Sequence, residues 1–252
     1  MNSRSPWMKQ NLHQRTALHW AIIQRHLEIV QTLISRTPQE ALIQQDQDGH
    51  TSLHLAAKVG HLEIVQELVK NCMQLDALLM KQDEIGATAL HFAAYGGHLG
   101  IVQFLVSQMP PEALVIEDFE QNIALHVAAK FGRFNVIQEL VKHMPKKALM
   151  KQDQLGHTAL HLAAYAGHLE SVKTLLKWMP QDGLEDEDIF GTTALNLAVE
   201  AGHSRVALEL RRAKIEFIKK CTTKRPDHSK KATMVQRFLA TIGVCMREFQ
   251  IL

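Results

Sequence analysis

The sequence predicts an all-α protein of six tandem helix–turn–helix units, and three observations lead to this prediction. First, a T-x-L-H unit with Ala or Ser at x recurs six times, with Ile replacing Thr once and Asn replacing His once. Second, the copies follow at 35 residues, or 37 in one case. Third, a second apolar stretch follows every copy, after a Gly in all but the first. Such a period is typical of repeat proteins whose units stack on their neighbours. The fourth positions are His19, His54, His91, His126, His161 and Asn196.

Each unit opens with a short helix. In "TALHLAAYA", Leu160, Ala163 and Ala164 share one side at helical spacing, and the small alanines allow the next unit to approach closely. A Gly follows at one fixed position, where it supplies the positive φ that ends the helix and reverses the chain. The first unit has Arg25 there instead, so an altered turn is expected. The glycines are Gly60, Gly97, Gly132, Gly167 and Gly202.

A second helix and a link complete the unit. The stretch "HLEIVQELVK" has apolar residues at helical spacing: Leu62, Ile64, Val65, Leu68 and Val69. In four of the links a Pro precedes small, helix-forming residues, which predicts an extra helical turn. The second link, "CMQLDALLMKQD", has two more residues and accounts for the spacing of 37. Each link ends in an Asp: Asp46, Asp83, Asp118, Asp153 and Asp188.

Together these features resemble the ankyrin repeat, whose signature is a T-P-L-H unit opening a first helix, then a Gly turn and a second helix. The Pro of that signature is Ala or Ser in every copy, which leaves the fold unchanged because Pro is not required in a first helical turn. The resemblance implies a solenoid with extended helical links and projecting hairpin-like fingers that begin at the link Asp. We expect an N-terminal lead (1–10), six repeats (11–210) and a basic C-terminal helical extension (211–252).

Fifteen histidines raise the question of a metal or catalytic site, but ten of them fall at two repeat positions. Five are in the T-x-L-H units, where the resemblance implies hydrogen bonds between neighbouring repeats. The other five open second helices: His26, His61, His98, His168 and His203. Zinc needs three or four ligands at about 2 Å, whereas stacked repeats lie roughly 10 Å apart. No metal site is therefore predicted, and His50 and His157 in the fingers are interpreted as solvated turn residues, with freer chemistry as the alternative.

Catalytic motifs are missing from the sequence. It contains no G-x-x-x-x-G-K-[ST], no G-x-G-x-x-G after a strand and no G-x-S-x-G. Cys72, Cys221 and Cys245 show no paired spacing, which favours a reducing compartment over a disulfide framework. We therefore predict a protein that is not an enzyme, with no catalytic residues, cofactor or small-molecule substrate.

The candidate binding residues follow from the resemblance, which implies that the two residues after each L-H-x-A-A face a concave groove. Lys58, Tyr95, Lys130 and Tyr165 alternate at the first of these positions, and Phe131 adjoins Lys130. Tyr is prominent among binding hot spots because it buries a large area and keeps a polar tip. The alternative is that Tyr and Lys are simply tolerated at an exposed position.

The predicted fingers carry apolar residues just before their turn. Ile85, Leu155 and Phe190 share one position, and Phe119 and Ile189 lie one residue earlier. An exposed apolar tip favours contact with a partner, and packing on the neighbouring finger is the alternative.

The C-terminal fifth differs in charge from the rest. Residues 204–252 hold twelve Lys and Arg against four Asp and Glu, a net charge of +8, whereas the remainder has a net charge of −6. An apolar stripe at helical spacing follows in residues 232–252, for which we expect a helix that caps the last repeat. Docking on anionic lipid or in a partner's groove is the alternative.

The sequence thus predicts a non-enzymatic module that binds a partner protein through its groove. The alternative is an adaptor that associates with membranes or nucleic acid through the basic extension. The long Pro-containing links and small size also resemble ankyrin proteins of intracellular bacteria, which implies an effector acting on a host protein. The expected location is the cytoplasm, or the host cytoplasm if the chain is a secreted effector.

Overall fold

The computed structural model describes residues 9–223 and divides into two compact units, Met1–Arg211 and Arg212–Leu252. The first unit contains the repeats. Of the second unit, the described part is the end of one helix, so the helix and cap expected in residues 232–252 lie outside the described residues. None of the described helices combines the length and the hydropathy needed to cross a bilayer.

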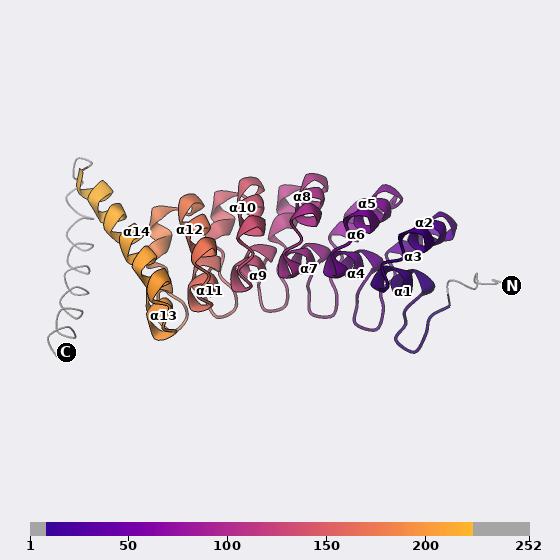
Figure 1. Cartoon of the computed structure of the whole chain (residues 1–252), viewed down its shortest axis with the longest axis horizontal. Helices are drawn as coiled ribbons and strands as arrows, with labels where there is room; N and C mark the ends of the chain where they lie inside the picture. Colours follow the sequence, from indigo (N-terminus) through magenta and orange to yellow (C-terminus); the bar gives the residue numbers. More distant parts are fainter. Residues whose placement is uncertain (1–8, 224–252) are drawn as a thin grey trace. The chain divides into compact units, whose positions relative to one another are not determined.

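The repeats are pairs of antiparallel helices, as predicted. In repeats 1 to 5, the first helix packs on the first helix of the next repeat and on the second helix of its own. Figure 1 shows the two resulting layers. The first helices are α1 (Ala17–Ile23), α4 (Ser52–Val59), α7 (Ala89–Gly96), α9 (Ala124–Lys130), α11 (Ala159–Tyr165) and α13 (Ala194–Glu200). The second helices are α2 (Leu27–Arg36), α5 (Leu62–Lys70), α8 (Leu99–Gln108), α10 (Phe134–His143), α12 (Leu169–Trp178) and α14 (Ser204–Thr223).

The links contain the extra helical turn that their sequences predict. In the first two links it is a short α-helix, α3 (Gln39–Leu42) and α6 (Leu75–Leu79). In the later links it is a 3₁₀ turn, η2 (Pro111–Val115), η3 (Lys146–Met150) and η4 (Gln181–Glu185). Buried link residues such as Leu42, Leu78 and Leu114 join the continuous core, so the links extend the stack.

The turn between the two helices has one conformation in every repeat. Gly60 and Gly97 have φ values of +81° and +74°, as expected for Gly at this position. Arg25 has a φ of +63°, and the turn closes with the same backbone hydrogen bond, from His26 N–H to the Ala21 carbonyl at 2.9 Å. The expected alteration of the first turn is therefore wrong, because Arg25 adopts the strained left-handed conformation instead of changing the turn.

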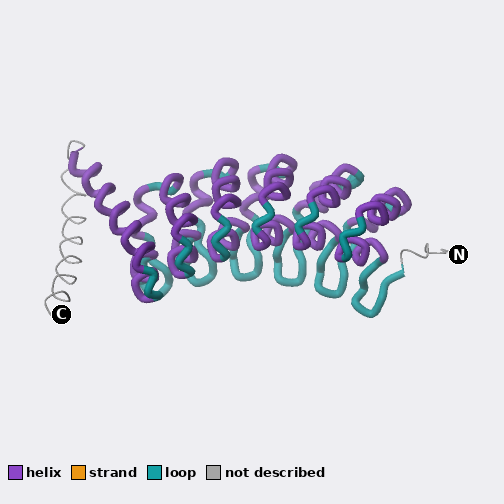
Figure 2. Tube along the Cα trace, viewed as in Figure 1, coloured by secondary structure: helices purple, strands orange, loops and turns teal. Residues whose placement is uncertain are grey.

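The fingers precede the first helices and project on one side of the row (Figure 2). In each described finger the link Asp accepts, through Oδ1, hydrogen bonds from the backbone N–H groups two and four residues later. At Asp83 these bonds measure 3.0 Å from Ile85 and 2.8 Å from Ala87. This carboxylate clamp makes a tight turn, and a β-bridge, Glu187 with Thr193, occurs in the last finger.

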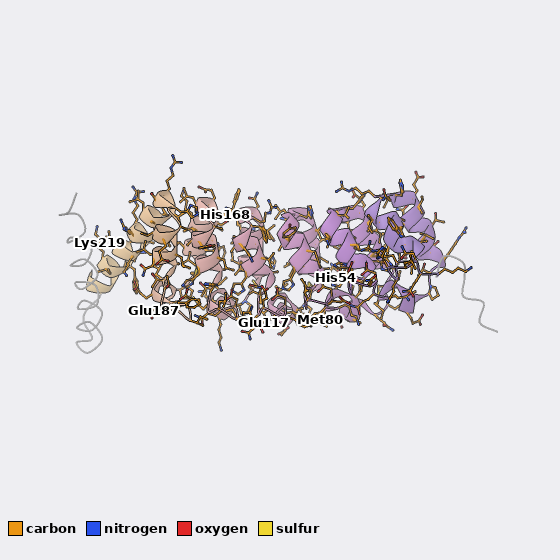
Figure 3. The ribbon with its side chains drawn as sticks, turned by 90° about the horizontal axis from the view of Figure 1, so that it is seen from below. His54, Met80, Glu117, His168, Glu187 and Lys219 are labelled. Atoms are coloured by element: carbon orange, nitrogen blue, oxygen red, sulfur yellow. The ribbon has the colours of Figure 1, made fainter. Side chains whose placement is uncertain are left out.

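Neighbouring fingers are joined by single backbone hydrogen bonds. Phe119 N–H donates to the Ile85 carbonyl at 3.0 Å, and Ile189 N–H donates to the Leu155 carbonyl at 3.1 Å. Seen from the finger side, Met80, Glu117 and Glu187 lie along one edge of the row and His168 lies nearer the other (Figure 3). The fingers therefore form a continuous, mutually bonded surface beside the first helices.

Candidate functional site

In repeats 2 to 5 the T-x-L-H histidine connects its repeat to the next, as the resemblance implied. In repeat 2 the backbone N–H of Thr51 donates to His54 Nδ1 at 3.0 Å, and His54 Nε2 lies 3.2 Å from the Ala87 carbonyl in the next finger. An amide N–H only donates, so Nδ1 is the acceptor and the ring proton lies on Nε2. The same Nε2–carbonyl bond recurs from His91, His126 and His161, at 3.0, 2.9 and 3.1 Å.

These rings are held in the neutral form. Burial lowers the pKa of His54 to about 4, and burial also lowers the pKa of His19 to about 4. Desolvation lowers the pKa values of His91, His126 and His161 as well. A proton on Nδ1 would face a backbone N–H, so protonation would break the bond that starts each first helix.

The histidines that open second helices have a different structural role. The His168 ring packs over Gly132 of the preceding repeat, and its Nε2 lies 3.1 Å from the Lys130 carbonyl. Arg133 takes the equivalent position in repeat 4, where its Nε donates to the Tyr95 carbonyl at 3.0 Å. These two side chains close the end of the preceding first helix, so they stabilise the stack of repeats.

The finger histidines are not solvated turn residues, and that interpretation was wrong. His50 is 8% exposed and lies between carboxylates of two fingers, with Nδ1 3.6 Å from Asp46 and Nε2 3.6 Å from Asp83. His157 has the same arrangement, with Nδ1 3.3 Å from Asp153 Oδ2 and Nε2 3.5 Å from Asp188 Oδ2. Both rings therefore bridge adjacent fingers.

One finger groups residue types that bind metals. Single ligand atoms of Asp46, Asp48 and His50 lie within 4.8 Å of one another. The guanidinium of Arg15 already pairs with this group, at 2.9 Å from Asp46 and 3.0 Å from Asp48. The positive charge beside these two carboxylates is therefore supplied by the arginine.

Cys72 gives no sign of a nucleophile. Cys72 is buried in the core, and burial raises the pKa of its thiol. A catalytic cysteine needs the opposite shift, toward the thiolate.

The predicted groove residues lie on one exposed surface, which we name the groove face: the side of the first helices adjoining the fingers. Tyr95 is 50% exposed and Tyr165 is 63% exposed. The Tyr95 ring meets Phe131 of the next repeat edge to face, with centroids 4.6 Å apart. The ammonium of Lys58 lies 5.3 Å from the centre of the Phe92 ring. The groove face therefore has an aromatic patch in repeats 3 and 4.

The finger tips are exposed in the structure. Ile85, Phe119, Leu155 and Phe190 all present large apolar side chains to solvent. Phe119 also packs on its neighbour, because a Cβ on Gly86 would lie 2.7 Å from its ring. Packing on the preceding finger thus explains the placement of Phe119 and leaves most of its ring exposed.

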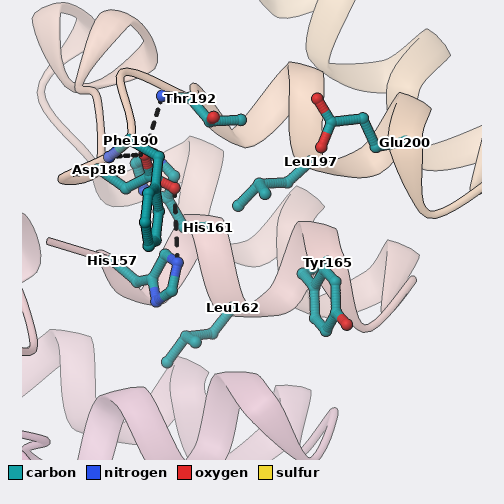
Figure 4. A pocket seen from close by; sticks show the side chains of 9 residues that line it. All are labelled: His157, His161, Leu162, Tyr165, Asp188, Phe190, Thr192, Leu197 and Glu200. Carbon is teal, nitrogen blue, oxygen red and sulfur yellow. Dashed lines mark hydrogen bonds and ion pairs between the residues drawn. The ribbon is translucent and has the colours of Figure 1, made fainter. Parts of the chain in front are cut away.

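A pocket of about 310 Å³ opens on the groove face between repeats 5 and 6 (Figure 4). Phe190 of the last finger and Tyr165 of α11 stand on two sides, with Leu162 and Leu197 between them. Glu200, at the end of α13, is exposed at the rim. The remaining lining residues are His157, His161, Asp188 and Thr192.

Three apolar residues that lie on the groove face below the exposed positions were not predicted from the sequence. They occupy the x position of L-H-x-A-A, or its equivalent in repeat 6, three residues before Tyr95, Tyr165 and Glu200. These residues are Phe92, Leu162 and Leu197. Residues three apart share a helix face, so this spacing was the available signal.

Comparison with known proteins identifies the class of the chain. A family model described as ankyrin repeats (three copies) matches four overlapping segments, residues 3–77, 37–115, 71–150 and 125–221. The chain therefore belongs to the ankyrin repeat family, whose members typically serve as protein–protein interaction modules. No catalytic family was found, and the comparison with curated proteins gave no significant match.

Proposed function

We propose that this ankyrin repeat protein binds a partner protein through its groove face and finger tips. The observation that carries the proposal is the pair of exposed tyrosines at equivalent positions: Tyr95, in edge-to-face contact with Phe131, and Tyr165, across the pocket from Phe190. Aromatic side chains this exposed are the residues from which binding hot spots are built. Lys58, Lys130 and Phe131 extend the same surface, as do Ile85, Phe119, Leu155 and Phe190 on the fingers.

The test is the affinity of tyrosine variants for a partner captured by the full chain. Tyr95→Ala and Tyr165→Ala should each weaken binding by about 1–3 kcal/mol, as expected for hot spots. Thermal stability should change little, because both side chains are at least half exposed. Ile29→Ala is a matched control, since Ile29 is equally exposed but lies on a second helix. Unchanged affinity of the double tyrosine variant would refute the proposal.

A second candidate site is the basic extension, proposed as residues 211–252 after a lead of 1–10 and repeats of 11–210. The net charge of +8 over residues 204–252 favours binding to a polyanion, nucleic acid or an anionic membrane. Such binding weakens steeply with salt, whereas binding through the tyrosines does not. A cytoplasmic location, and an effector role on a protein of a host cell, accompany the proposal of protein binding through the groove face as predictions from the sequence.

A further inference from the structure

We infer that the pocket between repeats 5 and 6 takes an arginine side chain of the partner. The inference rests on the proposed function and specifies its chemistry at one place. Three features of the pocket support it: its size, its aromatic and aliphatic walls, and the sign of its charge.

The size selects a side chain over a larger ligand. A volume of about 310 Å³ is at the lower limit of pockets that hold small molecules, which run from about 300 to 1,000 Å³. One long side chain with part of its backbone therefore fits, and a nucleotide cofactor does not.

The walls suit a long side chain with a planar charged end. Leu162 and Leu197 offer an apolar floor for a methylene stem, which Lys and Arg both bury readily. The rings of Tyr165 and Phe190 stand on two sides, where a guanidinium stacks on an aromatic face more favourably than the strongly hydrated ammonium of Lys does.

The charge of the lining is complementary to a cation. None of the nine lining residues is Lys or Arg, and two are carboxylates, Asp188 and Glu200. Asp188 is buried and committed to the finger, where it accepts two backbone hydrogen bonds and lies 3.5 Å from His157. Glu200 is exposed and has no hydrogen bond or ion pair with the described residues. Its carboxylate is thus available for the two parallel hydrogen bonds that a guanidinium donates.

The test uses the full chain with isotope-labelled leucine methyl groups and the peptide acetyl-Gly-Gly-Arg-Gly-Gly-amide. We expect saturable shifts of the Leu162 and Leu197 methyl signals, with a Kd on the order of 1 mM. The same peptide with citrulline in place of arginine keeps the shape and loses the charge. It should bind at least about threefold more weakly.

Two variants test whether Glu200 is the carboxylate that pairs with the guanidinium of the peptide. Glu200→Gln should weaken the arginine peptide about three- to tenfold. Glu84→Gln, which removes an exposed carboxylate on the finger of repeat 3, away from the pocket, should leave binding unchanged. Equal binding of the two peptides, an unchanged Kd in Glu200→Gln, or no saturable shift at the two leucines would overturn the inference. If any of these occurs while Tyr95→Ala still weakens the protein complex, the inference fails and the proposed function stands.

Discussion

Replacing His54 by Asn should reduce the amount by which the free energy of unfolding falls when the pH is lowered. Asn is the chain's own alternative, because Asn196 takes the equivalent position in repeat 6. Burial lowers the His54 pKa from 6.5 to about 4 in the folded chain. Between these values the unfolded state binds more protons, so the stabilisation is complete above pH 6.5 and is lost as the pH falls toward 4.

The magnitude follows from the two pKa values. Lowering the pH from 7 to 5 should cost the folded state about 2 kcal/mol for each histidine whose pKa falls this far. His19 has the same shift, and the lowered pKa values of His91, His126 and His161 act in the same direction. The parent chain should therefore lose several kcal/mol of unfolding free energy over two pH units.

The assay is urea unfolding at pH values from 7 to 5. His54→Asn should be less stable at pH 7, because the bond to the Ala87 carbonyl is lost, but should lose about 2 kcal/mol less on acidification. Val65→Ala, in the same repeat, is the control: it also lowers stability but keeps His54 and hence the full pH dependence. An unchanged pH dependence in His54→Asn would refute the assignment of a neutral, buried ring.

Two further predictions concern the left-handed turn positions. Gln121→Gly should raise the unfolding free energy by about 0.5–1 kcal/mol in urea titrations, since Gln121 has a φ of +63° and Gly removes that strain at some entropic cost; a loss of stability would contradict it. Gly132→Ala should cost about 1–2 kcal/mol more than Gly202→Ala, because its Cβ would lie 2.6 Å from the His168 ring, whereas no atom of the described residues lies within 4 Å of a Cβ at Gly202. If the two variants lost the same free energy of unfolding, the His168 ring would be able to move aside at no energetic cost, which would contradict this prediction.

The sequence was sufficient to predict the repeats, because each structural role recurs with a fixed spacing. The helix pairs, the extra turn in the links and the Asp that clamps each finger could all be read from one residue type at one repeat position. The exposure of Tyr95 and Tyr165 followed from the same register.

The features that the sequence did not predict depend on contacts between repeats, and a pattern within one repeat contains no information about such contacts. The burial of His50 depends on Asp83 in the next finger, so a turn residue that looked solvated became a bridge. Arg25 stands where the other repeats have Gly, yet it adopts the same left-handed conformation, with a φ of +63°. The pocket is formed by Tyr165 and Phe190, which come from successive repeats. Leu162 and Leu197, which line its bottom, could not be told from core residues in the sequence.

The most direct test of the central claim, that the groove face binds a protein, is site-specific photo-crosslinking. The photoreactive residue p-benzoylphenylalanine replaces Tyr165, or Ile29 as an equally apolar control on a second helix, and each chain is irradiated with the captured partner. The account predicts a covalent adduct with the partner from position 165 and none from position 29. An adduct from position 29 and none from position 165 would contradict it.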